Sequence, residues 1–161
     1  MNLFESHAPE GSIEASEMVC FIDGASRGNP GEAGFGVTAQ WQGETEDFYG
    51  YIGKATNNVA EYMAFLAAAL WAREKKARSL KVFSDSELIV KQLKGYYRVK
   101  NPTLAKLHRA AIDLLEPLER FSITHVPREE NKTADKLANQ AVNLKASGFP
   151  QNFPERDLPR L

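Results

Sequence analysis

Phe21-Ile22-Asp23-Gly24-Ala25-Ser26-Arg27-Gly28-Asn29-Pro30-Gly31 is the stretch that decides the fold of this chain. An apolar run predicts a buried strand over 18–23, and the glycines and the proline that follow predict a tight connection. Asp23 therefore stands at the end of a buried strand. Removing a carboxylate from water there is costly unless a partner or a metal ion takes up its charge.

The rest of the chain predicts an α/β domain. Strands expected at 34–42 and 46–53 form an antiparallel meander with the first strand. Two more strands are expected at 80–84 and 121–126, parallel to the first because their connections pass through helices. The helices are predicted at about 57–76, 86–93, 103–115 and 131–145. The result is a mixed five-stranded sheet flanked by helices.

The bulk properties predict a soluble cytoplasmic protein. The chain has 161 residues, of which 43% are hydrophobic and 25% charged, which suits one domain with a real core. We expect a loose N-terminal arm over 1–16, a domain over 17–147 and an irregular, proline-containing tail over 148–161. The start of the chain does not look like a secretory signal, and no apolar stretch could span a bilayer. We expect a monomer with no membrane contact and no evident protein partner.

Three further acids share the unusual setting of Asp23. Asp85 ends the apolar run 80–84, Glu61 lies inside an apolar helical stretch, and Asp135 opens the last helix. The carboxyl ends of parallel strands meet at one edge of a sheet, so these side chains can converge there. Magnesium prefers oxygen ligands, and two such ions suit in-line phosphoryl transfer. The pattern indicates a divalent-cation site.

Each acid also has a purely structural interpretation. Asp23 and Asp85 can be turn or cap residues, since acids are favoured at helix N-termini. Asn58 and Glu61 have the spacing of a capping box, which for Glu61 taken alone is the favoured interpretation. Asp135 can offset the dipole of the helix that it opens. No Cys or His cluster with zinc spacing is present.

The net charge of −1 conceals a basic segment. Residues 88–112 contain no acid and six lysines or arginines, and Tyr96 and Tyr97 lie among them. A solvated face is the common explanation of such a run. The interleaved tyrosines favour contact with a polyanion.

At this point four short motifs, in order along residues 18–146, resemble type 1 ribonuclease H. The quoted segment resembles the first-strand signature of that family, and the other three motifs are Thr56-Asn57-Asn58-Val59-Ala60-Glu61-Tyr62, Ser84-Asp85-Ser86 and Thr133-Ala134-Asp135-Lys136-Leu137-Ala138. The resemblance implies a ribonuclease H-like fold and endonucleolytic cleavage of the RNA strand of RNA–DNA hybrids. It implies two Mg²⁺ ions, for which Mn²⁺ can substitute, and products with 5′-phosphate and 3′-hydroxyl ends.

The resemblance also assigns roles to residues by position. Asp23, Glu61, Asp85 and Asp135 match the catalytic, metal-binding carboxylates. Two further sets match substrate-binding positions: Ser26, Asn29 and Asn57 for ribose hydroxyls, and Thr56 and Asn58 for a phosphate of the DNA strand. Helix capping is the alternative for Asn57 and Asn58, and both roles can coexist.

Three departures from the family pattern affect the substrate contacts. Glu87 stands where many members carry a glutamine that helps to read the RNA, and the short segment 95–102 replaces a long basic protrusion. The loop 127–131 is short and lacks the histidine that many members have there; His125, before it, is expected to be packed on its strand. Arg128 is the candidate for the assisting role, by binding phosphate, with a surface arginine as the alternative.

Two other functions remain open at this stage. One is a non-catalytic module that binds RNA–DNA hybrids, and the other is a related exonuclease or transposase-like nuclease on the same fold. The four acids argue against the first, because a pure binder gains nothing from carboxylates that face a phosphate. The glycine-rich turn and the Thr-Asn-Asn run argue against the second.

Overall fold

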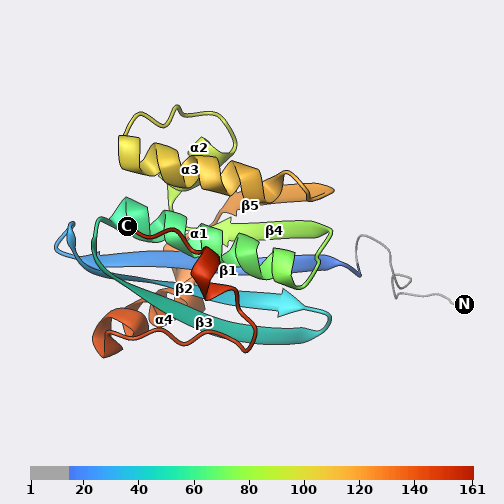
Figure 1. The fold of residues 1–161 in the computed structure, drawn as a ribbon, viewed down its shortest axis with the longest axis horizontal. Helices are drawn as coiled ribbons and strands as arrows, with labels where there is room; N and C mark the ends of the chain where they lie inside the picture. The colour runs from blue at the N-terminus through green and yellow to red at the C-terminus, as the bar shows by residue number, and fades with distance from the viewer. Residues whose placement is uncertain (1–14) are drawn as a thin grey trace, which may run out of the picture.

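A five-stranded mixed sheet forms the centre of the molecule (Figure 1). The computed structural model describes residues 15–161. The strands are β1 (Glu17–Arg27), β2 (Gly31–Trp41), β3 (Glu44–Ala55), β4 (Ser79–Ser84) and β5 (Arg120–His125). Their order is β3-β2-β1-β4-β5, with β1 to β3 antiparallel and β4 and β5 parallel to β1. This confirms the predicted fold class.

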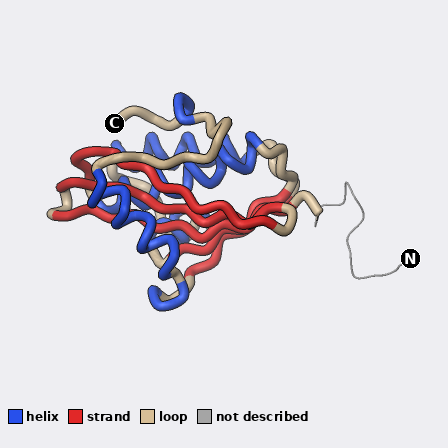
Figure 2. Tube along the Cα trace, turned by 90° about the horizontal axis from the view of Figure 1, so that it is seen from below, coloured by secondary structure: helices blue, strands red, loops and turns tan. Residues whose placement is uncertain are grey.

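Helices cover both faces of the sheet. They are α1 (Asn57–Glu74), α2 (Glu87–Leu93), α3 (Pro102–Leu115) and α4 (Lys132–Leu144). The edge view shows α1 and α3 on one side of the sheet and α4 on the other (Figure 2). Short 3₁₀ turns lie at Arg128–Glu130 and Glu155–Asp157. In the described part of the chain, no helix has the length and apolar character needed to cross a membrane.

The first hairpin is longer than the sequence predicts. β1 continues past residue 23 to Arg27, and β2 already begins at Gly31. Residues beyond Asp23 remain paired across the ladder, for example Ser26 with Ala33. Only the tip is a turn, where Gly28 adopts a left-handed φ of 118°. The small residues after Asp23 therefore extend the strand, and the hairpin projects beyond the edge of the sheet where Asp23 lies.

Helix α1 is buried on nearly every side. The sheet lies under it, α3 packs beside it, and the C-terminal segment crosses it (Figure 1). Tyr62, Phe65, Leu66 and Trp71 are all at most 1% exposed. A helix that is apolar all round is the pattern expected of a central helix. Its position is therefore fixed by packing on several sides.

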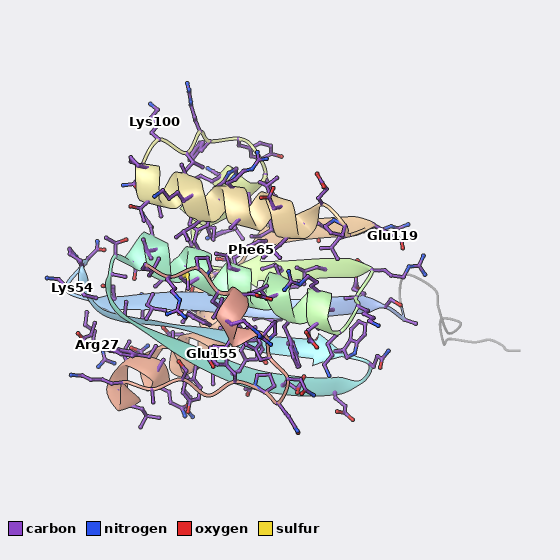
Figure 3. All side chains as sticks on the ribbon, viewed as in Figure 1. Arg27, Lys54, Phe65, Lys100, Glu119 and Glu155 are labelled. Atoms are coloured by element: carbon purple, nitrogen blue, oxygen red, sulfur yellow. The ribbon has the colours of Figure 1, made fainter. Side chains whose placement is uncertain are left out.

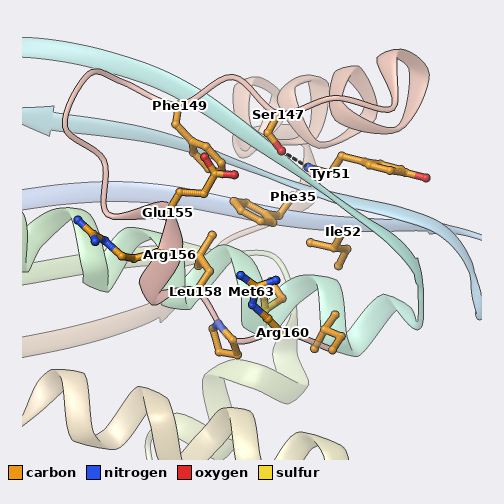
Figure 4. Close-up of a pocket in the computed structure, with 12 residues that line it drawn as sticks. Phe35, Tyr51, Ile52, Met63, Ser147, Phe149, Glu155, Arg156, Leu158 and Arg160 are labelled. Carbon is orange, nitrogen blue, oxygen red and sulfur yellow. Dashed lines mark hydrogen bonds between the residues drawn. The ribbon is translucent and has the colours of Figure 1, made fainter.

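The C-terminal tail packs against the body of the protein. Gly148 exchanges two backbone hydrogen bonds with Tyr49, and the rings of Phe149 and Phe153 stack with centroids 4.5 Å apart. Phe153 also contacts Trp71 of α1, with ring centroids 5.9 Å apart. A cavity of about 610 Å³ lies between the tail and the sheet (Figure 4). Beside it, the Ser147 hydroxyl accepts a hydrogen bond from the backbone N–H of Tyr51 in β3.

At the other end of the chain, the carbonyl of Ser16 accepts hydrogen bonds from the backbone N–H groups of Arg78 and Ser79, at 2.9 and 3.3 Å. The start of β1 is thereby tied to the start of β4. Most of the predicted N-terminal arm, residues 1–14, lies outside the described residues, so that part stays a prediction.

Candidate active site

Three of the four predicted acids meet at the carboxyl edge of the sheet. Asp23 lies on β1, Glu61 on α1, and Asp85 directly after β4. One carboxylate oxygen from each lies within 4.8 Å of the others. Asp23 and Glu61 are only 5% exposed, and Asp85 is half-buried. Three distant segments therefore build one compact set of oxygen donors.

Two glycines allow the helices to come this close. A Cβ atom on Gly24 would lie 2.4 Å from the backbone carbon of Ala60 and from the nitrogen of Glu61. A Cβ atom on Gly36, which pairs with Asp23, would lie 2.4 Å from the carbonyl oxygen of Ala134 in α4. Because backbone atoms cannot move aside cheaply, only glycine fits at either position.

Asp135 and Arg128 complete the cluster. Asp135, in the first turn of α4, lies close enough to Asp23 for its carboxyl group to raise the pKa of Asp23. The Nη2 atom of Arg128 lies 3.9 Å from Oδ1 of Asp135, and its charge also lowers the pKa of Glu61. The Arg128 side chain is 81% exposed, so it lies at the mouth of the site. All four acids and the predicted assisting residue therefore lie together.

The electrostatics of this cluster are unfavourable without a cation. Burial, followed by the charge of Asp85 and the contact with Asp135, raises the pKa of Asp23 from 3.8 to about 8. Burial and the charges of Asp23 and Asp85 raise the pKa of Glu61 well above its ordinary value. The backbone N–H of Gly24 lowers both pKa values but does not outweigh these effects.

One oxygen in the cluster has no partner. The Oε1 atom of Glu61 is buried and accepts no hydrogen bond from any described residue. A buried acceptor of this kind normally finds a partner, so the atom is left for a ligand. The donor set consists of carboxylate oxygens alone, which fits a hard divalent cation such as Mg²⁺ or Mn²⁺ and does not fit zinc.

The capping interpretations of Glu61 and Asp85 are wrong. Helix α1 is capped by Thr56, whose hydroxyl accepts from the N–H of Val59 at 3.2 Å. Helix α2 is capped in the same way by Ser86, which follows Asp85. Neither acid is needed at a helix end, which leaves both carboxylates available to the cluster. The dipole interpretation of Asp135 is compatible with its place in the first turn of α4.

The predicted substrate-binding residues lie where the hairpin meets α1. The Ser26 hydroxyl donates to the carbonyl of Ala55 at 2.7 Å, and Oδ1 of Asn29 accepts from the backbone N–H of Asn57 at 2.8 Å. Asn57 and Asn58 are exposed. Beside them is a cavity of about 390 Å³, whose lining includes Asn29, Lys54, Thr56, Asn58, Asn101 and Thr103.

Cationic side chains lie at this end of the molecule as well. Lys54 lines the cavity, and the side chains of Lys100 and Arg27 also project from this end (Figure 3). Helices α1 and α3 both begin here, and the positive ends of their dipoles favour an anion. The cavity therefore has the polarity expected of a phosphate site.

The basic segment presents its aromatic rings to solvent. Tyr96 is 72% exposed and Tyr97 is 49% exposed, with Lys94 and Lys91 5.9 and 5.0 Å from the respective ring centroids. Glu87 opens α2 as an exposed residue with an oxygen 3.8 Å from Nζ of Lys91.

His125 does not match its expectation. It ends β5, which is an edge strand, and its side chain is exposed rather than packed.

The sequence did not point to two asparagines beside the acids. Asn131 is 1% exposed, and its Nδ2 atom donates to the carbonyl of Ile22 at 2.8 Å and lies 3.4 Å from Oδ2 of Asp85. Asn139 donates from Nδ2 to the carbonyl of Asp135 at 2.9 Å. Asn131 directly precedes a helix and looks like a cap, whereas its side chain makes no capping bond. The only feature of the sequence that could have pointed to Asn131 is its position four residues before Asp135.

The comparisons with known proteins agree with this geometry. Residues 21–141 match the family described as reverse transcriptase-like. Ribonuclease HI of Halobacterium salinarum is 41% identical over 125 residues, which are 76% of this chain and 63% of that protein. The bifunctional protein Rv2228c of Mycobacterium tuberculosis is 41% identical over 133 residues, which are 81% of this chain and 36% of that protein. The chain thus spans about a third to two thirds of these relatives.

Solved structures show the same relationship. The crystal structure of RNase H1 from Halobacterium salinarum superposes with a TM-score of 0.75 at 40% identity, covering 79% of this chain and 98% of that one. LC11-RNase H1 in complex with an RNA/DNA hybrid gives a TM-score of 0.73 at 38% identity, covering 80% and 98%. The chain belongs to the reverse transcriptase-like family, in its type 1 ribonuclease H branch.

Proposed function

We propose that this protein is a metal-dependent endoribonuclease that hydrolyses the RNA strand of RNA–DNA hybrids, leaving 5′-phosphate and 3′-hydroxyl ends. The observation that carries the proposal is the set of carboxylate oxygens of Asp23, Glu61 and Asp85 within 4.8 Å of one another. The relatives named ribonuclease HI, and the neighbour that was solved with an RNA/DNA hybrid, support the choice of substrate.

Two Mg²⁺ ions held by the four acids would supply the charge neutralisation and the activated nucleophile for in-line displacement at phosphorus. The chain's own part is to hold the donors in place. Asp23 lies between Glu61, Asp85 and Asp135, so it is the acid best placed to serve both ions. Arg128, at the mouth, would bind a phosphate oxygen but cannot carry protons, because its guanidinium stays charged.

Recognition of the substrate rests on the hairpin and the start of α1. Asn29, Ser26 and the exposed Asn57 lie at one junction, where short polar side chains can reach a 2′-hydroxyl. The cavity beside Thr56 and Asn58 suits a phosphate of the DNA strand. The exposed tyrosines and lysines of the segment 94–100 would extend the contact along the duplex.

The test is cleavage of an end-labelled RNA–DNA duplex with and without Mg²⁺, with double-stranded RNA and DNA as comparison substrates. We expect cleavage of the RNA strand of the hybrid alone, and a loss of at least 1,000-fold in Asp85→Asn, which keeps the shape of the side chain but removes its charge. Asp113→Asn is the matched control, because Asp113 is exposed on α3, where it pairs with Arg109.

Three results would contradict the proposal in different ways. Tight binding without product, indifferent to Mg²⁺, would indicate a hybrid-binding module. Equal cleavage of hybrid and double-stranded DNA, or stepwise removal of single nucleotides from an end, would indicate a different nuclease on the same fold. Full activity of Asp85→Asn would remove the acidic cluster from the chemistry.

A further inference from the structure

The side chain of Asn131 connects the acidic cluster to the backbone of the central strand. Asn131 lies at the entry to α4 and is 1% exposed. One amide nitrogen faces two acceptors: the carbonyl of Ile22 at 2.8 Å, and Oδ2 of Asp85 at 3.4 Å. Ile22 directly precedes Asp23. A single side chain therefore touches the strand that carries one acid and the carboxylate of another.

Only the donor end of this amide is used. Its Oδ1 atom is buried and has no hydrogen-bond partner among residues 15–161. A buried polar oxygen without a partner is unfavourable. An apolar residue would fill the same space without burying an unpaired oxygen. Capping does not explain the asparagine either, because the Asn131 side chain makes no capping hydrogen bond to α4. The cost of the unpaired Oδ1 atom is offset by the contacts of Nδ2 with the Ile22 carbonyl and the Asp85 carboxylate.

The carboxylate that it faces is the one that most needs orientation. Asp85 follows the last residue of β4, so the sheet ladder no longer fixes its backbone. The neighbouring Ser84 hydroxyl accepts from the N–H of Ser86, which shapes the turn but makes no contact with the carboxylate. Among the described side chains, Asn131 is the only hydrogen-bond donor recorded for Asp85.

We propose that Asn131 is a positioning residue, which orients the Asp85 carboxylate toward Asp23 and Glu61 and so prepares the site for divalent cations. This proposal rests on the proposed function for the identity of the ligand. Partners that orient metal ligands in this way typically change metal affinity or activity by about 10- to 100-fold when they are removed. The role is distinct from catalysis, since Asn131 need not touch the substrate.

The first experiment measures Mg²⁺ binding to the metal-free chain by titration calorimetry, without substrate. We expect Asn131→Ala to weaken Mg²⁺ binding by about 10-fold or more. The matched control is Ser79→Ala, which removes a buried hydroxyl that donates to Oε2 of Glu17 at 3.1 Å, at the end of β4 far from the acidic cluster. Both variants are expected to melt at a lower temperature, but only the first should lose Mg²⁺ affinity. In hybrid cleavage, Asn131→Ala should lower kcat more than it changes KM.

A second measurement uses the side-chain amide signals in the ¹H–¹⁵N spectrum and does not require Asn131→Ala to fold. In Asp85→Asn, the Nδ2 protons of Asn131 should shift, because a charged acceptor has become neutral, while those of Asn101 should stay in place. An unmoved Asn131 signal, or Mg²⁺ affinity within about two-fold of wild type in folded Asn131→Ala, would overturn the inference. Failure of the wild type to bind Mg²⁺ or to cut hybrid would overturn the proposed function instead, and the spectrum would still test the contact.

Discussion

Replacing Asp23 with asparagine should stabilise the metal-free protein and abolish its activity. The carboxyl of Asp23 has its pKa raised from 3.8 to about 8, mainly by burial and then by Asp85. The folded chain therefore holds a proton that the unfolded chain releases above about pH 4. Stability consequently falls as the pH rises from about 4 to about 8, which is the direction expected when the folded state binds more protons.

The size of this stability change follows from the two pKa values of Asp23, 3.8 in the unfolded chain and about 8 in the folded protein. From pH 3.8 to pH 7 the folded protein keeps the proton, and at about 1.4 kcal/mol per pH unit this amounts to about 4 kcal/mol. Asparagine carries no charge at any pH, and its amide can still donate to Asp135. Asp23→Asn should therefore gain on the order of 4 kcal/mol at pH 7 and almost nothing at pH 4. For a chain of 161 residues this is a rise of about 10 °C in Tm.

The assay is thermal unfolding in EDTA at pH 4 and pH 7, for wild type, Asp23→Asn and the surface control Asp113→Asn. Adding Mg²⁺ should narrow the difference in Tm between the two proteins, because the cation stabilises the wild-type site more than the variant site. An increase in Tm that is equal at pH 4 and pH 7 would show that Asp23→Asn stabilises the protein through packing and not by removing a charge. No gain at pH 7 would show that Asp23 is ionised in the folded protein, and the electrostatic argument would fail.

Three other predictions follow from the same structure. Mg²⁺ binding at pH 7 should release about one proton, because Asp23 must ionise to bind the ion; equal heats in buffers of different ionisation enthalpy would contradict this. Gly24→Ala should displace Glu61 and reduce cleavage more than 100-fold, with destabilisation of about 1–3 kcal/mol; an active, fully stable variant would refute the backbone contact. Truncation after Ser147 removes the stacked Phe149 and Phe153, so Tm should fall by about 5–10 °C while hybrid cleavage persists; unchanged melting would show that the tail contributes nothing.

The sequence predicts the convergence of the acids because two independent rules agree. Apolar runs ending in Asp23 and Asp85 identify strand ends, and parallel strands place their ends at one edge. The end of β1 was harder to predict. The apolar run ends before residue 23, whereas the strand continues to Arg27 through backbone pairing with β2. Small residues permit this pairing, but their side chains give no hydrophobic pattern from which to predict it.

Glu61 shows why a local pattern can mislead. Asn58 and Glu61 have the spacing of a capping box, but the cap is decided by where α1 begins. That point is set from outside the helix, because Asn29 accepts the N–H of Asn57 and Thr56 accepts the N–H of Val59. Sequence spacing alone cannot supply this information. Asn131 was missed for the same reason, since its partner Ile22 is 109 residues away.

Repulsion among the acids cannot be relieved by movement of α1. Tyr62, directly after Glu61, is 1% exposed and donates from its hydroxyl to Oε1 of Gln92 in α2 at 2.6 Å. Gly24 brings the backbone of β1 into contact with α1, so the helix cannot slide along the strand. With the backbone fixed, the charge can be offset only by a proton or by a cation. Burial and the charge of Asp85 raise the pKa of Asp23 to about 8, so a proton offsets the charge in the metal-free protein, and a divalent ion would replace it without rearranging the fold.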